Sequence, residues 1–171
     1  MRVSGRGFSL IELLIVVAII LIIAAIAIPD LLKSRTAANQ ASAVGSIKMV
    51  VTSEVSYNST YTVGYSSTLM QLDGNLVPSD STSAGLIDSV LASGVKSSYN
   101  FYYVPCVNPA VPNNGTLATG PCGGAPVTIY EISANPSAGT GFGNYYFGDN
   151  SGVIRQNSTS PAGSADTPIG G

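Results

Sequence analysis

Apolar residues along the chain follow two patterns, which predict a long N-terminal helix and a strand-rich remainder. The first pattern is an unbroken run of sixteen apolar residues, 13–28, which starts after Glu12 and ends at Pro29. Together with the residues before it, the stretch 8–28 is long enough to cross a hydrocarbon core of about 30 Å as a helix. It carries a single charge, on Glu12. The sequence therefore predicts a transmembrane helix close to the N-terminus.

A second helical half is predicted beyond Pro29, which lacks an amide hydrogen and should kink the helix. From residue 31 to about residue 57, apolar residues recur at steps of three and four, which is the spacing of one helix face. The predicted stripe consists of Ala37, Ala41, Val44, Ile47, Val51 and Val55, with Lys33, Ser34, Asn39, Gln40, Ser46 and Lys48 opposite it. We expect one long helix over residues 8–57, membrane-spanning over 8–28 and amphipathic over 29–57.

The composition changes after residue 57, where Ser, Thr, Gly, Asn and Pro separate short apolar runs. Candidate strands, rich in β-branched and aromatic residues, are 99–104, 127–132, 144–147 and 152–156. A short helix is expected around residues 86–91 with Gly94 as its C-terminal cap, and a hairpin turn at 148–152. Residues 158–171 show no periodicity and are expected to fray. Residues 58–171 thus predict an α+β fold, in which a small antiparallel sheet forms a head on the second half of the long helix.

Composition narrows the classes of function. Only 9% of residues are charged, far below the average of about 25%, and the formal net charge is −2. Without a basic face, nucleic-acid binding is not expected. The chain has no His, which excludes a His base or a His-ligated metal. No dense carboxylate cluster points to a metal or another cofactor, so Asp73, Asp80, Asp88 and Asp149 are expected in turns and helix caps.

The charges that flank the apolar run predict its orientation. Arg2 and Arg6 lie in a short polar leader that ends at Gly7, and basic residues favour the cytoplasmic side. One alternative is a secretory signal peptide, whose apolar region is shorter, about 7–15 residues, although residues 25–27 resemble its small-residue cleavage site. Another is a plain anchor, which leaves Glu12 unexplained because a carboxylate inside a membrane helix costs about 2.5–3.5 kcal/mol.

Residues 7–20, which read GFSLIELLIVVAII, resemble the class III signal sequence of type IV pilins and type II secretion pseudopilins. The resemblance continues through IPDLL at 28–32 and AANQASAV at 37–44. It implies cleavage between Gly7 and Phe8 by a prepilin peptidase at the cytoplasmic face, and N-methylation of Phe8. It also implies a pilin-like fold and a structural subunit, not an enzyme, which machinery outside this chain assembles into a helical filament.

The resemblance also implies a role for Glu12. After cleavage Phe8 carries an α-amino group, and Glu12 of one subunit is expected to pair with this amine on its neighbour in the filament. Paired charges cost far less in a low-dielectric core than a lone carboxylate does. The alternative is that Glu12 only extends to the lipid headgroups.

The predicted function is that of a type IV pilus subunit in adhesion, motility or related surface functions. Such a subunit waits in the cytoplasmic membrane and then becomes part of an extracellular filament. The alternatives are a pseudopilin of a type II secretion system, a minor pilin, and a membrane-tethered exported binding protein. A mere tether does not require Gly7, Phe8 and Glu12, and these residues therefore favour the filament subunit.

Cys106 and Cys122 are the only cysteines. Because the region that contains them is expected to be exported, where disulfides persist, a bond between them is predicted. It would close a loop of Pro, Asn and Gly and stabilise the fold by about 3 kcal/mol. Metal binding would need more ligands, and a catalytic thiol would usually need a His. Many type IV pilins close a loop near the C-terminus with a cysteine pair, but here nearly fifty residues follow Cys122.

Overall fold

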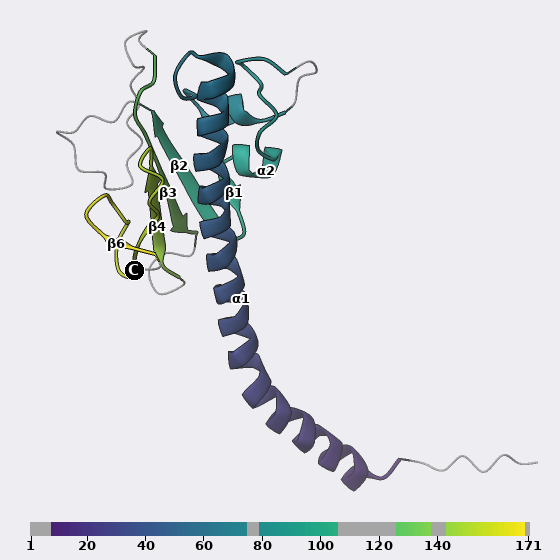
Figure 1. Ribbon diagram of the computed structural model, residues 1–171. Coiled ribbons are helices and arrows are strands. Elements are labelled where there is room, and N and C mark those ends of the chain that lie inside the picture. The colour runs from purple at the N-terminus through teal and green to yellow at the C-terminus, as the bar shows by residue number, and fades with distance from the viewer. Residues whose placement is uncertain (1–7, 75–78, 106–125, 138–142, 170–171) are drawn as a thin grey trace, which may run out of the picture. The chain divides into compact units, whose positions relative to one another are not determined.

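The computed structural model describes residues 8–74, 79–105, 126–137 and 143–169 (Figure 1). The chain divides into two compact units, Met1–Ala37 and Ala38–Gly171. One helix, α1 (Leu10–Tyr61), begins in the first unit and ends in the second. A six-stranded antiparallel sheet follows it, which confirms the predicted α+β fold.

The helix α1 continues further than predicted. It runs through Pro29 without interruption and ends at Tyr61, four residues beyond the expected end. The rings of Tyr57 and Tyr61 lie 5.0 Å apart between centroids, a contact that stabilises the last turn. The following residue, Thr62, has a φ of +54° and ends the helix. The kink at Pro29 stays a prediction.

The sheet is a meander in which each strand pairs with the next one along the chain. Its strands are β1 (Val95–Lys96), β2 (Tyr99–Pro105), β3 (Tyr130–Pro136), β4 (Tyr145–Asp149), β5 (Arg155–Asn157) and β6 (Thr167–Pro168), and all pairs are antiparallel. Four of them overlap the predicted strands, although β3 and β5 each begin three residues later. The strands β1 and β6 were not predicted, because two residues are too few to show an alternating pattern.

Two short helices lie between α1 and the sheet in sequence: η1 (Leu69–Leu72), a 3-10 helix, and α2 (Ser89–Ala92). The helix α2 confirms the predicted short helix. The Asp88 carboxylate caps its start by accepting the amide hydrogen of Leu91 at 3.0 Å. Gly94, with a φ of +82°, follows its end in the left-handed conformation. The expected capping role of Asp88 is therefore confirmed.

Two further aspartates take up the turn positions that their residue type predicted. The Asp80 carboxylate accepts the amide hydrogens of Thr82 at 2.8 Å and Ser83 at 3.1 Å. The Asp149 carboxylate accepts the amide hydrogen of Ser151 at 2.8 Å, inside the predicted hairpin turn between β4 and β5. Side chains of this kind fix tight turns by replacing backbone partners.

Within the second unit, α1 contributes one face to the core. Its buried residues are Ala43, Ser46, Ile47, Val50, Ser53, Glu54 and Tyr57. The apolar ones among them, Ala43, Ile47, Val50 and Tyr57, belong to one cluster with the inward side chains of the sheet, Tyr99, Phe101, Tyr103, Tyr130, Ile132, Ala134 and Tyr146. The predicted stripe was wrong in its rotation, since only Ile47 of its six members is buried and Val55 is exposed. Two serines and a glutamate lie on the buried face, so the apolar periodicity did not mark it.

The contact between α1 and the sheet depends on Gly148 in β4. A Cβ atom at this position would lie 2.7 Å from Cγ2 of Ile47 and 3.7 Å from Cγ2 of Val51. Ile47 is fully buried, and its side chain therefore has little room to move away. The helix lies this close to β4 because Gly148 has no side chain.

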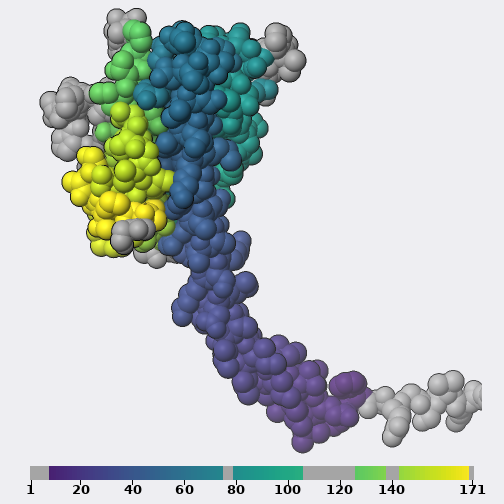
Figure 2. Space-filling model, viewed as in Figure 1, coloured from purple at the N-terminus to yellow at the C-terminus, as the bar shows by residue number. Residues whose placement is uncertain are grey.

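Residues 158–169 pack onto the sheet and do not fray as predicted. Ala162 forms a second buried cluster with Tyr145 and Phe147, which alternate with the inward-facing Tyr146 and so lie on the outer face of β4. Figure 2 shows the C-terminal residues, in yellow, against the yellow-green strands that precede them. The sequence shows no periodicity here because a single alanine and individual hydrogen bonds hold the segment.

The hydrogen bonds of this C-terminal segment centre on Asp166. Its carboxylate accepts from Nδ2 of Asn157 at 2.9 Å and from the amide of Gly163 at 2.8 Å. Its carbonyl oxygen accepts from Nη1 of Arg155 at 3.0 Å. The side chains of β5 thus attach the segment that ends in β6.

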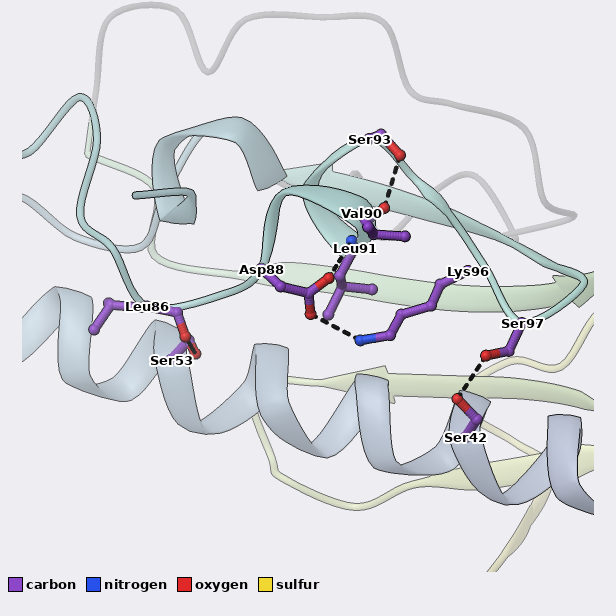
Figure 3. A network of polar contacts seen from close by, with 9 residues as sticks. All are labelled: Ser42, Ser53, Leu86, Asp88, Val90, Leu91, Ser93, Lys96 and Ser97. Carbon is purple, nitrogen blue, oxygen red and sulfur yellow. Dashed lines mark hydrogen bonds and ion pairs between the residues drawn. The ribbon is translucent and has the colours of Figure 1, made fainter. Parts of the chain in front are cut away.

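The turn between β1 and β2 is strained. Ser97 and Ser98 have φ values of +51° and +62° and connect the paired residues Lys96 and Tyr99. This is the geometry of a type I′ hairpin, which favours Asn and Gly because other residues pay for the left-handed conformation. The hydroxyl groups of Ser97 and of Ser42 on α1 lie 2.8 Å apart, which attaches the turn to the helix (Figure 3).

Replacing Ser98 with glycine is expected to stabilise the second unit by about 1 kcal/mol, because glycine adopts a positive φ without steric cost. Thermal unfolding of the whole chain in detergent measures the change. Ser93→Gly is the matched control, since Ser93 has a φ of −68° and its hydroxyl donates to the carbonyl of Val90. This control should be neutral or destabilising, and a loss of stability in Ser98→Gly would contradict the assignment of strain.

Candidate processing and assembly segment

The helix α1 begins next to the predicted cleavage position. Phe8 and Ser9 precede its first residue, Leu10, and Phe8 is 80% exposed. The amide hydrogen of Ser9 is donated to Oε2 of Glu12 at 2.9 Å, and the carbonyl of Ser9 accepts from the amide of Leu13 at 3.2 Å. This is half of a capping box, in which an acidic residue at the third helical position satisfies a free amide at the helix start.

Glu12 therefore has a local role that its residue type alone did not reveal. A carboxylate in the first turn also interacts favourably with the positive end of the helix dipole, by about 0.3–1 kcal/mol. Cleavage between Gly7 and Phe8 would create a free amine on Phe8. Phe8 directly precedes Ser9, whose amide hydrogen Glu12 already accepts. The same carboxylate can then take part in helix capping and in charge pairing.

The apolar part of α1 has no packing partner among the residues that the structure describes. Its large hydrophobic side chains between Leu10 and Leu32 are between 46% and 80% exposed. By length and composition, one 18-residue window of α1 could cross a membrane, and none of that window is buried. Exposed apolar surface of this extent marks a segment that contacts lipid or other proteins.

Three of the predicted site residues lie outside the part of the chain that the structure describes. Gly7, Cys106 and Cys122 lie outside the described residues, and cleavage at Gly7 and the disulfide between the cysteines stay predictions. Pro29 lies inside α1, beside an exposed pair in which Lys33 Nζ and Asp30 Oδ1 are 4.0 Å apart. Exposed pairs of this kind contribute little to stability. Of the predicted positions, Glu12 is placed by its contact with the amide of Ser9, the residue that follows Phe8.

Residues 4–28 match the family model described as the prokaryotic N-terminal methylation motif. The N-terminal segment therefore carries a prepilin-type methylation motif. The chain is 48% identical over 62 residues to the type IV major pilin protein PilA of Myxococcus xanthus, a match that covers 33% of this chain. It is 61% identical over 36 residues, 21% of this chain, to the type IV wide pilus major component PilA4 of Thermus thermophilus.

The likeness of this chain to these two proteins is partial. The matched part spans 28% of the length of each of the two pilus proteins. No solved structure matches the chain significantly. The comparisons thus support the N-terminal resemblance, while the head is described by its own structure.

Sequence reasoning missed two carboxyl groups in the second unit. Glu54 on α1 is fully buried, and Glu131 on β3 is half-buried. A single Glu between polar and apolar neighbours gives no signal of burial, because glutamate is almost always exposed. Only the tertiary partners of these groups show that they are unusual.

Glu131 lies directly opposite Asp149 in the register of β3 and β4. Like charges in such cross-strand pairs are destabilising. Oε2 of Glu131 is buried and has no hydrogen-bond partner among the described residues. Burial, and then repulsion by the Asp149 carboxylate, raises the pKa of Glu131 from 4.5 to about 7.

This pair predicts that the second unit loses stability as pH rises. The folded chain binds a proton at Glu131 more tightly than the unfolded chain does. The stabilisation that proton binding at Glu131 gives to the folded chain is therefore fully present below pH 4.5. It is lost as pH rises through about 7. After allowance for solvent screening, we expect a loss of about 1–3 kcal/mol across this window.

Chemical unfolding of the whole chain in detergent between pH 4.5 and 8 measures this dependence. The variant Glu131→Gln should have a flatter profile than the wild type. Asp149→Asn is the matched control for repulsion, because it removes the charge but keeps the oxygen that accepts from Ser151. Identical pH slopes in the wild type and in Glu131→Gln would show that the pair does not titrate as described.

Proposed function

We propose that this chain is the precursor of a structural subunit of a type IV pilus, which serves adhesion, motility or a related surface function, and that it is not an enzyme. The observation that carries the proposal is the start of α1. An exposed apolar helix begins two residues after Phe8, and Glu12, the single acidic residue of the stretch 8–28, caps its first turn. The matched methylation motif covers the same residues.

The proposed maturation begins in the cytoplasmic membrane. Residues 8–28 span the bilayer, with the leader in the cytoplasm and the head exported, as the basic leader predicts. A prepilin peptidase cleaves between Gly7 and Phe8, and the new terminus at Phe8 is methylated. Loss of Arg2 and Arg6 changes the formal net charge from −2 to −4.

Assembly then transfers the apolar helix from lipid into a helical filament of identical subunits, driven by the pilus assembly machinery. Glu12 of one subunit pairs with the Phe8 amine of a neighbour, which sets the register of otherwise uniform apolar helices. A paired carboxylate is tolerated in this core, whereas an unpaired one is costly. The head, with its few charges, forms the outer surface. Two pilus proteins among the curated relatives support a pilus subunit over a pseudopilin.

The processing step is tested by Gly7→Val. A small residue is expected immediately before the cleaved bond, so this variant should retain the leader and Met1. Gly5→Val is the matched control, since it places the same change two residues earlier in the leader. N-terminal mass spectrometry of membrane-extracted protein measures both. A normal mature terminus at Phe8 in Gly7→Val would overturn the proposed processing.

The location of the mature protein distinguishes a pilin from a pseudopilin. Filaments sheared from cells should consist mainly of this chain, beginning with methylated Phe8. Loss of protein secretion in a deletion strain without surface filaments would instead show a pseudopilin. A protein recovered without residues 8–28 would exclude both, because assembly needs the apolar helix.

A further inference from the structure

The strongest unexplained feature of the head is the buried carboxyl group of Glu54. Both Glu54 and Ser66 are fully buried. Oε2 of Glu54 accepts the amide hydrogen of Ser66 at 2.9 Å, and Oε1 lies 2.5 Å from Oγ of Ser66. Ser66 belongs to the connector, residues 62–68, which joins the end of α1 to η1. The side chain of Glu54 thus binds the connector to the helix from which it departs.

Among the residues that the structure describes, no cation accompanies the carboxyl group of Glu54. The ion pairs in the described part of the chain are Asp30–Lys33 and Asp88–Lys96, and neither involves Glu54. Outside the described ranges, the residues beyond position 8 include no Lys or Arg. The titratable groups that interact with Glu54 are all tyrosines: Tyr57 on α1, Tyr103 on β2 and Tyr130 on β3, with Tyr65 of the connector against the Tyr130 ring. A buried carboxylate without a cation is strongly disfavoured.

The geometry around Ser66 indicates where the protons lie. The Tyr103 hydroxyl donates to the carbonyl oxygen of Ser66 at 2.8 Å. Oγ of Ser66 contacts both Oε1 of Glu54, at 2.5 Å, and the hydroxyl oxygen of Tyr103, at 3.4 Å. Each hydroxyl group carries one proton. Because the Tyr103 hydroxyl donates its proton to the carbonyl of Ser66, the Ser66 hydroxyl is left with one proton for two neighbouring oxygens. It can donate either to Oε1 of Glu54 or to the hydroxyl oxygen of Tyr103.

A proton on Glu54 completes this network. Oε1 then donates to Oγ of Ser66, Oγ donates to Tyr103, and Tyr103 donates to the carbonyl of Ser66. Oε2 still accepts from the Ser66 amide. When Glu54 loses its proton, the hydroxyl oxygen of Tyr103 no longer receives a hydrogen bond from Ser66. The carboxylate of Glu54 also remains buried with a negative charge, which favours opening of the structure.

We propose that Glu54, Ser66 and Tyr103 form a proton-dependent latch, closed when Glu54 is protonated and opened, releasing the connector from α1, when that proton is lost. Burial, the largest effect, raises the pKa of Glu54, while the hydrogen bonds from Ser66 act in the opposite direction. The folded chain therefore holds this proton more tightly than the unfolded chain, so the latch closes toward acidic pH and weakens as pH rises.

Amide hydrogen exchange of Ser66, in the whole chain in detergent micelles, measures the opening. Above the titration point, the protection factor of this amide should fall by up to about tenfold per pH unit, since one proton is released. Glu54→Gln should keep protection high and independent of pH, because the Gln amide group can donate to Oγ and accept from the Ser66 amide. Glu131→Gln is the matched control and should keep the pH dependence of the wild type at Ser66.

Constant protection of Ser66 across the pH range in the wild type would overturn the latch. So would an unchanged pH dependence in Glu54→Gln. A second measurement does not depend on the folding of that variant. The chain contains three glutamates, Glu12, Glu54 and Glu131. In Glu131→Gln labelled with carbon-13 at glutamate carboxyl groups, one of the two remaining signals should keep the shift of the protonated acid to a pH above the ordinary glutamate pKa of 4.5. Loss of the proton from both groups at or below that pH would refute the proposal.

Discussion

Replacing Glu12 with alanine is expected to leave the chain inserted in the membrane but to lower the yield of filaments by about tenfold or more. Insertion should persist because a carboxylate opposes membrane insertion by about 2.5–3.5 kcal/mol, and alanine removes this cost. Assembly should fail because the neighbouring Phe8 amine would lose its partner in a low-dielectric core. Removing one member of such a pair typically costs 3–5 kcal/mol. Quantifying the chain in sheared surface material and in membranes measures the two steps separately.

The variant Glu12→Gln separates the two roles of this side chain. Its amide oxygen can still accept the amide hydrogen of Ser9, as Glu12 does at 2.9 Å, but it carries no charge. If charge pairing drives assembly, Glu12→Gln should fail as Glu12→Ala does. Assembly of Glu12→Gln but not of Glu12→Ala would assign the effect to helix capping. Wild-type yields from both variants would overturn the proposed pairing with Phe8.

Gly148→Ala is expected to destabilise the second unit by about 2–3 kcal/mol, because the new Cβ would lie 2.7 Å from Cγ2 of Ile47. Thermal unfolding of the whole chain in detergent, followed by tyrosine near-ultraviolet circular dichroism, measures the loss of packing. Gly163→Ala is the matched control, since a Cβ at Gly163 would meet no atom within 4 Å. This control should be within about 0.5 kcal/mol of the wild type.

A double-mutant cycle with Ile47→Ala tests the contact itself. Ile47→Ala alone should be destabilising, because it leaves a cavity in the core. In its presence Gly148→Ala should cost less, since the atom that it approaches is gone, and the two changes should couple by more than 0.5 kcal/mol. Additive effects of Gly148→Ala and Ile47→Ala would mean that the helix and β4 are not in the described contact.

The N-terminal segment could be predicted from the sequence in most of its features. An apolar run, the single acid Glu12 and the basic leader are properties of neighbouring residues, and so is the match over residues 4–28. Helix length and membrane compatibility depend on the same local properties. The strands β2 and β4 were also predicted, because their aromatic and β-branched residues stand between clear turn signals.

The rotation of α1 in the head was decided only by the tertiary structure. Periodicity placed Ser46 on the solvent face, yet Ser46, Ser53 and Glu54 are buried. Ser53 can be buried because its hydroxyl donates to the carbonyl of Leu86, 33 residues away, and Glu54 because its carboxyl group makes two hydrogen bonds with Ser66. A polar residue is buried where a distant group satisfies it, and that partner cannot be read from a local pattern.

The same distinction holds for the sheet. The residue types of Glu131 and Asp149 were visible in the sequence, but only the β3–β4 register places one carboxyl group opposite the other. Ala162 and Asp166 likewise became ordered through β4 and β5, although their own segment shows no pattern. For this protein, the local sequence determined the long apolar helix at the N-terminus. The long-range contacts decided which face of the helix is buried, where carboxyl groups lose their solvent, and how the C-terminal segment is held. The physical reason is that burial free energies depend on partners brought together by folding.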